Sequence, residues 1–373
     1  MKLVHLADLH LGFRAYNRLT TQGVNRREAD VFRAFQEALQ KTAELKPDVV
    51  LVAGDVFHVP RPGNLAVVQT QKELIKFQEA CAAEIVVIAG NHESVKSSDN
   101  RCILELMSLI PRIQVITNQP EAVEVCDGQV KVFCLPHNAL GQVEQIQIRP
   151  DLDYAYNLLM LHGTVDSDRI NDYGGYEIPT DLLTLPWDYV ACGHYHSYTP
   201  LGRNAYYAGA IERTSNDIWK EAKEDKGFVS FDLESHTAQF HRLTSPRKTV
   251  DLPIIDATGK DASILDQVIA DQANQVGIED KLVRQKVINL PKSLQRQLDY
   301  KQLRTFQMIA VHYLFEPRSP EISTNASNGE GATRQGSLAE KAQEFLQNRE
   351  LSAGIDRDRL VTRGLAYLNP SQE

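Results

Sequence analysis

The stretch Met1–Gly12 reads MKLVHLADLHLG and shows the pattern from which we predict the fold class of the chain. Residues 2–7 form a short apolar run that predicts a β-strand, and Asp8 and His10 follow it directly. The same order, an apolar run and then polar side chains, recurs at Gly54-Asp55, Gly90-Asn91-His92-Glu93, His162-Gly163 and Gly193-His194-Tyr195-His196. Open α/β sheets place their ligand crevices at the carboxyl ends of strands, so we expect these side chains to meet there.

Short β-type runs alternate with helix-like patterns up to about residue 200. Between the first two runs, Phe32, Phe35 and Leu39 form one stripe of a helix. Strands that alternate with helices indicate an α/β layered domain. The expected strands are 2–7, 49–53, 85–89, 131–135, 157–161 and 188–192, followed by β-type runs at 206–208, 227–233 and 238–243.

Composition narrows the class of protein. The 373 residues are enough for two or three domains, and 42% apolar with 24% charged residues is ordinary for a globular protein. A net charge of -9 argues against a uniformly DNA-coating surface but leaves room for a local basic patch. The five cysteines have no CxxC spacing, which predicts buried free thiols. Without a signal-peptide pattern or an apolar run of membrane-spanning length, we expect no membrane association and a cytoplasmic location.

A second, small α+β unit is predicted over residues 249–318, after a junction at Pro246-Arg247-Lys248. Its expected strands are 249–253, 281–290 and 309–315, and its expected helices are 261–276 and 299–306. From Lys281 to Arg318 there are eight Lys or Arg residues and two acidic ones. This local excess fits either a solvated face or a surface that contacts a phosphate backbone.

The last part of the chain predicts a linker and a helical segment. Residues 319–336 are polar and rich in Gly, Ser and Asn, as flexible linkers are. Residues 337–373 then carry two short amphipathic patterns, which either dock on the body of the protein or bind a partner groove. Ser337 is the expected N-cap of the first pattern, and the apolar positions are Leu338, Ala342, Phe345 and Leu346, then Ile355, Leu360, Val361, Leu365 and Leu368.

Seven side chains of metal-ligand type follow the predicted strands: Asp8, His10, Asp55, Asn91, His162, His194 and His196. They suit two neighbouring divalent ions of the manganese, iron or zinc kind, and paired ions are a device for cleaving phosphate esters. Asp55 is the natural bridge, because a carboxylate has two oxygens. Asp8, His10 and one late histidine can complete one site, and Asn91, His162 and the other late histidine can complete the second.

Other polar residues of these runs suggest roles in proton transfer. His92 adjoins Asn91 and can protonate the leaving oxygen of a phosphodiester, while Glu93 can orient that imidazole or stabilise its charged form. His58 lies three residues past Asp55 and can touch the substrate phosphate or a strand end. An isolated histidine is more often structural than a ligand, so we expect structural roles for His5, His137, His236, His241 and His312.

The runs DLHLG, GDVFH, GNHE, HG and GHYH resemble the calcineurin-like metallophosphoesterases, and within them the SbcD branch of double-strand-break repair nucleases. The resemblance implies an α/β fold with a four-layer metallophosphoesterase β-sandwich flanked by helices over residues 1–248. It adds a small α+β capping domain (249–318), the flexible linker (319–336) and a helical partner-binding tail (337–373). It implies two manganese ions, one held by Asp8, His10, Asp55 and His196 and the other by Asp55, Asn91, His162 and His194.

The same resemblance implies that His92 is the catalytic histidine and that His58 acts in exonuclease cleavage of DNA ends. The family usually has GNHD where this chain has Glu93. The implied function is a manganese-dependent DNA nuclease subunit of an SbcCD-type repair complex, both a 3′-5′ double-strand exonuclease and a single-strand and hairpin endonuclease. The implied partners are DNA ends and hairpins, an SbcC-type coiled-coil ATPase, and a second copy of the chain, with residues 95–110 as candidate dimer contacts.

Two alternatives stay open. A small-molecule or cyclic-nucleotide phosphodiesterase would use the same metal site without needing a basic wall from residues 250–318. A non-enzymatic scaffold on the same fold would usually lack some metal ligands, whereas all seven are present.

Overall fold

The computed structural model describes residues 1–94, 101–145, 148–165, 177–320, 343, 345–347 and 357–368. The chain divides into two compact units, residues 1–320 and 321–373. In the second unit, α8 (Arg357–Leu368) is described, at the place of the second amphipathic pattern. Nearly all of the expected linker lies outside the described residues, as do Ser337 and most of the first terminal pattern. The three predicted boundaries between the four regions therefore stay predictions.

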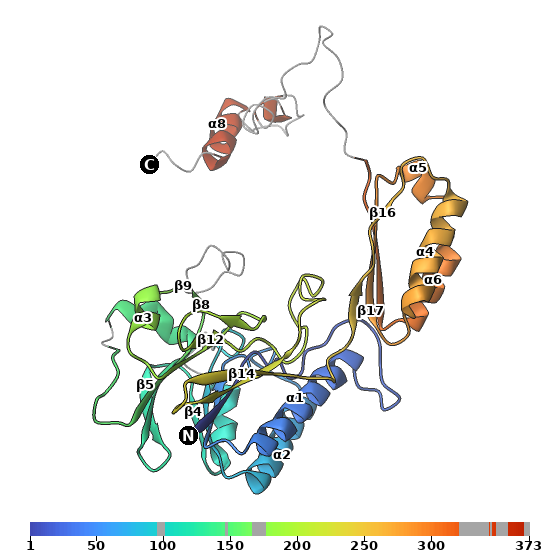
Figure 1. The fold of residues 1–373 in the computed structure, drawn as a ribbon. Helices are drawn as coiled ribbons and strands as arrows, with labels where there is room; N and C mark the ends of the chain where they lie inside the picture. The colour runs from blue at the N-terminus through green and yellow to red at the C-terminus, as the bar shows by residue number, and fades with distance from the viewer. Residues whose placement is uncertain are drawn as a thin grey trace. The chain divides into compact units, whose positions relative to one another are not determined.

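Two six-stranded sheets pack face to face in the first unit (Figure 1). The first sheet has the order β14-β13-β1-β2-β3-β4, and its last four strands run parallel. β13 pairs antiparallel with β1, and β14 pairs antiparallel with β13. The strands are β1 (Lys2–Leu6), β2 (Val49–Ala53), β3 (Glu84–Ile88), β4 (Ile113–Ile116), β13 (Gly227–Asp232) and β14 (Thr237–Arg242).

The second sheet has the order β11-β12-β10-β7-β6-β5. Its four central strands run parallel, and the two outer strands pair antiparallel with their neighbours. The strands are β5 (Glu121–Val125), β6 (Val130–Leu135), β7 (Tyr156–His162), β10 (Tyr189–Gly193), β11 (Thr199–Pro200) and β12 (Ala205–Tyr207). β8 (Thr164–Val165) and β9 (Glu177–Ile178) form a separate short ribbon.

Helices cover both outer faces of the sandwich. On the first sheet lie α1 (Arg26–Leu45), α2 (Asn64–Ala80) and the 3-10 helix η1 (Ile103–Leu109), and on the second lie α3 (Thr180–Thr184) and η2 (His137–Gln145). The Asn25 side chain accepts hydrogen bonds from the backbone N–H groups of Arg27 and Glu28 and so caps α1. The predicted fold class, four α/β layers built on a β-sandwich, is confirmed.

Alternation along β1 and β2 explains the two cores. Leu3 and Leu51 face the second sheet, where they pack with Leu158, whereas Val4 and Val50 face α1 and α2. Because both faces of these central strands are buried, β2 is apolar at every position, and β1 departs from this only at Lys2 and the buried His5.

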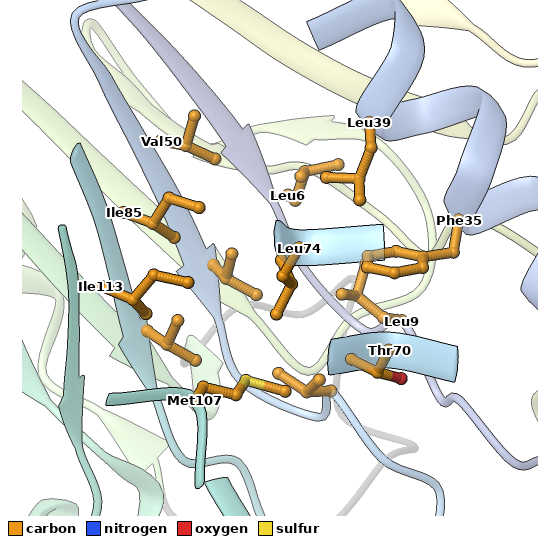
Figure 2. A pocket seen from close by; sticks show the side chains of 13 residues that line it. Leu6, Leu9, Phe35, Leu39, Val50, Thr70, Leu74, Ile85, Met107 and Ile113 are labelled. Carbon is orange, nitrogen blue, oxygen red and sulfur yellow. The ribbon is translucent and has the colours of Figure 1, made fainter. Parts of the chain in front are cut away.

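A small apolar void of about 20 Å³ lies between the first sheet and α1 and α2. Figure 2 shows Phe35, Leu39 and Leu74 pointing into it from the two helices. Thr70 is polar, but its hydroxyl donates to the Ala66 carbonyl at 2.7 Å, so the lining offers no unpaired group to a water. We read this space as a dry packing void and not as a binding site.

Residues 249–318 form the third packed element of the first unit. β17 (Leu282–Ile288) lies at the centre and pairs parallel with β15 (Thr249–Asp251), β16 (Ile255–Asp256) and β18 (His312–Pro317). α4 (Ala262–Val276), α5 (Lys292–Gln295) and α6 (Tyr300–Ile309) accompany this sheet, and Figure 1 shows α4 and α6 on one face of it.

Several predicted boundaries of this region differ from the structure. The expected first strand (249–253) ends earlier, as β15, and the separate short strand β16 follows it. α6 continues to Ile309, where the Ala310 N–H donates to the Phe306 carbonyl at 3.0 Å, so β18 begins at His312 instead of residue 309.

Two further expectations concern thiols and membranes. The five cysteines are free, and four of them are buried: Cys81, Cys102, Cys134 and Cys192. Cys126 is partly buried. Among the described residues, no helix is both long and apolar enough to cross a membrane.

Candidate metal centre

The seven candidate ligands lie at one end of the sandwich. Asp8 and His10 follow β1, Asp55 follows β2 and Asn91 follows β3. His162 ends β7, and His194 and His196 follow β10. Because β1–β3 run parallel in one sheet and β7 and β10 run parallel in the other, the carboxyl ends of all five strands bring these residues together.

The backbone at this end is strained. Asp8, His10, Asp55 and His194 have φ angles of 51°, 47°, 51° and 103°, in the left-handed region that side-chain-bearing residues rarely adopt. Each such residue costs about 1–3 kcal/mol and persists only where its surroundings hold it. Here the Asp8 and His10 N–H groups donate to the carbonyls of Gly54 and Asp55 at 3.1 and 2.9 Å. Strain of this kind concentrates at functional sites.

Glycine is required where the strand ends pack closest. A Cβ on Gly90 would lie 2.1 Å from Asp55 Oδ1, and one on Gly193 would lie 1.8 Å from the Ala53 carbonyl oxygen. No side chain fits at either position. The glycines of Gly90-Asn91 and Gly193-His194 are therefore required for the close approach of β2, β3 and β10, and these pairs are not ordinary turn dipeptides.

Asp55 lies at the centre of the cluster and is 2% exposed. Its Oδ2 lies 3.4 Å from His162 Nε2, 3.8 Å from His10 Nε2 and 3.9 Å from His92 Nε2. Its Oδ1 accepts the backbone N–H of His92 at 2.9 Å. Oδ2 thus faces the imidazoles of the cluster, and Asp55 would be the residue shared by two ions if both were bound.

On one side of Asp55, donor atoms of Asp8, His10 and His196 all lie within 4.8 Å of one another. The Nε2 atoms of His10 and His196 face each other at 3.0 Å. Burial lowers the pKa of His10 to about 3 and that of His196 well below its usual range. Both imidazoles are therefore neutral at physiological pH, which is the form that binds a divalent ion.

On the other side, donor atoms of Asp8, Asp55 and His162 lie within 4.8 Å of one another. Asn91 Oδ1 lies 2.9 Å from both His162 Nε2 and His194 Nδ1. His162 Nδ1 donates to the Ala53 carbonyl at 2.8 Å, which leaves Nε2 as the nitrogen that faces the cluster.

Two buried carboxylates demand positive charge at this place. Burial raises the pKa of Asp8 to about 7, a rise that His162 opposes and that the neighbouring Asp55 carboxylate reinforces. Burial alone would lower the pKa of His162, but the Asp55 carboxylate raises it to about 9, so a proton on His162 supplies the compensating cation. The mixed oxygen and nitrogen donor set fits divalent ions of the manganese, iron or zinc class.

His92 lies beside this cluster and is oriented by backbone. Its Nδ1 donates to the His58 carbonyl at 2.5 Å, since a carbonyl oxygen can only accept. Its Nε2 faces Asp55 and remains the nitrogen that can exchange a proton with a substrate. The side chain is 32% exposed, so a substrate can reach it.

His58 packs against the same group. Its Nδ1 lies 3.3 Å from His10 Nδ1, and its ring meets the Phe13 ring edge to face at 4.8 Å. Burial, together with the nearby His92, lowers the pKa of His58 to about 4. His10, His58 and His92 thus form a third group of close imidazoles.

Glu93 does not orient the His92 ring as the sequence suggested; the His58 carbonyl does so. The Glu93 carboxylate, 1% exposed, accepts the backbone N–H groups of Phe57 at 2.6 Å and Gly90 at 3.0 Å. It therefore cross-links the loops that carry Asp55 and Asn91. Burial and the Asp55 charge raise the pKa of Glu93 to about 8.

Of the five histidines expected to be structural, His137 lies at the candidate metal centre. His137 follows β6, donates from Nδ1 to the His162 carbonyl at 3.2 Å, and has its ring 6.4 Å from that of His194. Its position directly after a strand was the available signal. His5 contacts the Tyr189 hydroxyl and His241 contacts Ser230, whereas His312 stacks on Tyr16 and His236 lies in the β13–β14 turn.

Five of the seven candidate ligands, all but Asp8 and His162, line a cavity of about 420 Å³, and residues 214–217 and Lys220 form part of its wall. Next to this wall, Lys226 is buried, donates to the His196 carbonyl at 2.8 Å and pairs with Glu221. Neither feature was predicted, because the charged run 220–226 has the composition of an ordinary solvated loop.

Residues 1–198 match the family model "Calcineurin-like phosphoesterase". Among curated proteins, the chain is 28% identical over 245 residues to the DNA double-strand break repair protein Mre11 of Methanocaldococcus jannaschii, an alignment covering 63% of each chain. It is also 28% identical over 247 residues to the Methanococcus maripaludis protein of that name (62% of this chain, 63% of the relative). A third, from Sulfurisphaera tokodaii, is 24% identical over 250 residues (65% and 62%). The chain thus spans a little under two thirds of the length of these relatives.

Proposed function

Because the chain belongs to the calcineurin-like phosphoesterase family, we propose that it is a manganese-dependent nuclease that hydrolyses DNA phosphodiester bonds in double-strand-break repair. The observation that carries the proposal is the convergence of carboxylate, amide and imidazole donors from five strand ends around Asp55. The double-strand-break repair role follows the names of the Mre11 relatives.

In this proposal, Asp8, His10, Asp55 and His196 hold one ion, and Asp55, Asn91, His162 and His194 hold the other. Two divalent ions so bound would neutralise the charge of the scissile phosphate and activate a water for attack. The backbone bonds that hold Asp8 and His10 in left-handed conformations keep the ligands in place before substrate arrives.

His92 is proposed as the general acid. With Nδ1 committed to the His58 carbonyl, a protonated Nε2 points toward the cluster and gives its proton to the leaving oxygen. His58, which lies on the same side, is proposed to contact the strand end during exonuclease cleavage.

The DNA path is proposed to cross the open face of the sheet formed by β15–β18. Along β17, Val283 and Val287 face the helices α4 and α6, so the alternate residues Arg284 and Lys286 face the other way. Arg284 is paired with Asp251 and Glu316, which leaves Lys286 as the better candidate for a phosphate contact. The basic surface expected from composition is thereby narrowed to Lys286 as the proposed phosphate contact.

Two protein partners are proposed with it. The tail that contains α8 is proposed to bind an SbcC-type coiled-coil ATPase. A second copy of the chain is proposed to pack on the apolar side chains exposed on α2 and η1, namely Val68, Ile75, Leu106 and Leu109. Exposed apolar groups of this kind are typical of interfaces.

The proposed activity is tested with labelled duplex, hairpin and single-stranded DNA in manganese, with the ATPase partner present. We expect cleavage by the wild type, loss of all cleavage in His92→Ala, and loss of end trimming alone in His58→Ala. His236→Asn is the matched control, because it changes a histidine in a surface turn and Asn tolerates the left-handed backbone there. Intact DNA in every wild-type reaction would refute the proposal.

A cyclic or small-molecule phosphodiesterase is the second candidate, since a cavity of about 420 Å³ also suits a nucleotide-sized ligand. Lys286→Glu discriminates the two. It should weaken duplex cleavage more than cleavage of a small phosphodiester, with a smaller dependence on salt. Lys301→Glu makes the same charge change on α6 and should leave the duplex reaction unaltered.

A further inference from the structure

The wall of the cavity opposite the strand ends contains two hydroxyl groups without partners. Thr214 and Ser215 lie between β12 and β13 and line the same cavity as His10, Asp55 and His196. Thr214 is 5% exposed, and the hydroxyl oxygens of both residues are buried without a hydrogen-bond partner. Buried polar groups are nearly always paired, so an unpaired couple at a cavity calls for an explanation.

The loop that carries these hydroxyls is held firmly on both sides. Before it, the Arg213 guanidinium donates to the carbonyls of Glu221 at 3.0 Å and Glu224 at 2.6 Å. Behind it, Ile218 is buried with Leu282 and Val311. The hydroxyls are therefore not left unpaired by a loose segment.

Residues 249–318 supply most of the support behind the loop. The Trp219 ring lies 6.4 Å from the His312 ring, which in turn stacks on Tyr16 at 3.9 Å. The Arg284 guanidinium lies over Trp219 at 5.1 Å. One face of residues 214–220 thus borders the cavity while the other is packed against β17 and β18.

The charges of the loop favour an anion. Lys220 lines the cavity together with the hydroxyls. Asp217, the acidic member of the loop, also lines the cavity. Its charge interacts with Arg284: the pKa of that guanidinium is raised first by Asp251 and in addition by Asp217. Hydroxyl donors beside a lysine are a common arrangement for binding phosphate oxygens.

We propose that Thr214 and Ser215 form a second phosphate subsite, which binds the phosphodiester group next to the scissile one in a polynucleotide strand. The proposal rests on the proposed function and deepens it, because a substrate with a single phosphodiester cannot fill this subsite. The hydroxyls donate to the non-bridging oxygens of that phosphate, and Lys220 contributes charge. The subsite therefore selects polynucleotides over small phosphodiesters.

The test compares the double variant T214V/S215A, which removes both hydroxyls at nearly constant volume, with the wild type. Thr42→Val is the matched control, because the Thr42 hydroxyl in α1 is also buried and unpaired but lies far from the cavity in sequence and fold. Thr214→Ser keeps a hydroxyl and serves as the rescue. The first readout is the affinity for a short single-stranded oligonucleotide without metal, by fluorescence anisotropy, and the second is kcat and KM for that oligonucleotide and for bis-p-nitrophenyl phosphate in manganese.

We expect the double variant to lose about tenfold in oligonucleotide affinity, with a matching rise in KM and a smaller effect on the small ester. Thr42→Val should match the wild type and Thr214→Ser should fall close to it. If T214V/S215A does not fold, Ser215→Ala alone must show part of the loss.

Wild-type affinity in the double variant, or an equal loss on both substrates, would overturn the proposal. A wild type that cleaves the small ester but no polynucleotide would instead refute the proposed function.

Discussion

β1 and β2 pass through two regions of opposite character. Toward α1 and α2 they present Leu6, Val50 and Val52, which pack around a void no larger than a water molecule. A few residues further along the same strands, Asp8 and Asp55 occupy left-handed conformations among buried imidazoles. The apolar region gains free energy from burial, whereas the polar region costs free energy through strain and desolvated charge.

This contrast has a practical meaning: substitutions in the two regions should separate activity from stability. Changes at the strand ends should reduce catalysis and leave folding nearly intact. Changes beneath the helices should do the reverse. Three experiments test whether activity and stability separate in this way, and a fourth measures a surface contact outside both regions.

The largest effect is expected for His92→Gln. Glutamine keeps a polar side chain but cannot transfer a proton, so we expect kcat on DNA to fall by about a hundredfold to ten-thousandfold. Because the side chain is 32% exposed, the melting temperature should change by no more than about 2 °C. A large fall in melting temperature would mean that the two regions are not separable at this position.

Leu74→Ala should show the opposite behaviour. Leu74 is 6% exposed and borders the void in Figure 2, so its truncation enlarges an apolar cavity. We expect the free energy of unfolding to fall by about 2–5 kcal/mol in urea titrations. Specific activity of the folded fraction at low temperature should stay at the wild-type level, and its loss would contradict the separation.

Metal binding at the strand ends should increase the free energy of unfolding. Metal-free protein should gain about 2.7 kcal/mol for each of the two ions when manganese is added to a hundred times its dissociation constant, because the ions bind only the folded chain. Differential scanning calorimetry measures this gain. Asp55→Asn removes the bridging charge and should lose most of the gain, whereas Leu74→Ala should keep all of it.

The smallest effect concerns a surface contact remote from both regions. Burial opposes ionisation of Glu37, but hydrogen bonds from Ser245 and Thr244 lower its pKa from 4.5 to about 2. The stabilisation is therefore fully present above about pH 5 and disappears as the pH falls toward 2. At neutral pH, Glu37→Gln should cost about 1 kcal/mol of unfolding free energy. The difference between variant and wild type should shrink at pH 3, and a difference that grows on acidification would contradict this assignment.

The parts of the fold that could be predicted are those with a simple burial pattern. β2 was predicted over its full extent, and Phe35 and Leu39 lie on the buried stripe of α1 as expected. α2 was not predicted, because Val68 and Ile75 are exposed apolar residues that blur its stripe. β4 and β5 are also absent from the predicted strands. Both are short, and β5 lies at the edge of its sheet, where only Val123 and Val125 are buried.

For the candidate site, residue type and position after a strand led us to expect the seven candidate ligands and His92 in one cluster, and they lie at one end of the sandwich. His137 fits the same rule but was set aside, since an isolated histidine carries little information. The roles of Glu93 and of Thr214 could not be predicted, because they depend on contacts between segments far apart in the chain: Glu93 with the loop after β2, and residues 214–220 with β17 and β18.

We propose that residues from position 8 to position 196 hold two ions around Asp55. Crystals grown with manganese and measured near its absorption edge would locate those ions. We predict two anomalous peaks, one among Asp8, His10, Asp55 and His196 and the other among Asp55, Asn91, His162 and His194. A map without peaks at this end of the sandwich, or with a single peak that Asp55 does not touch, would contradict the account.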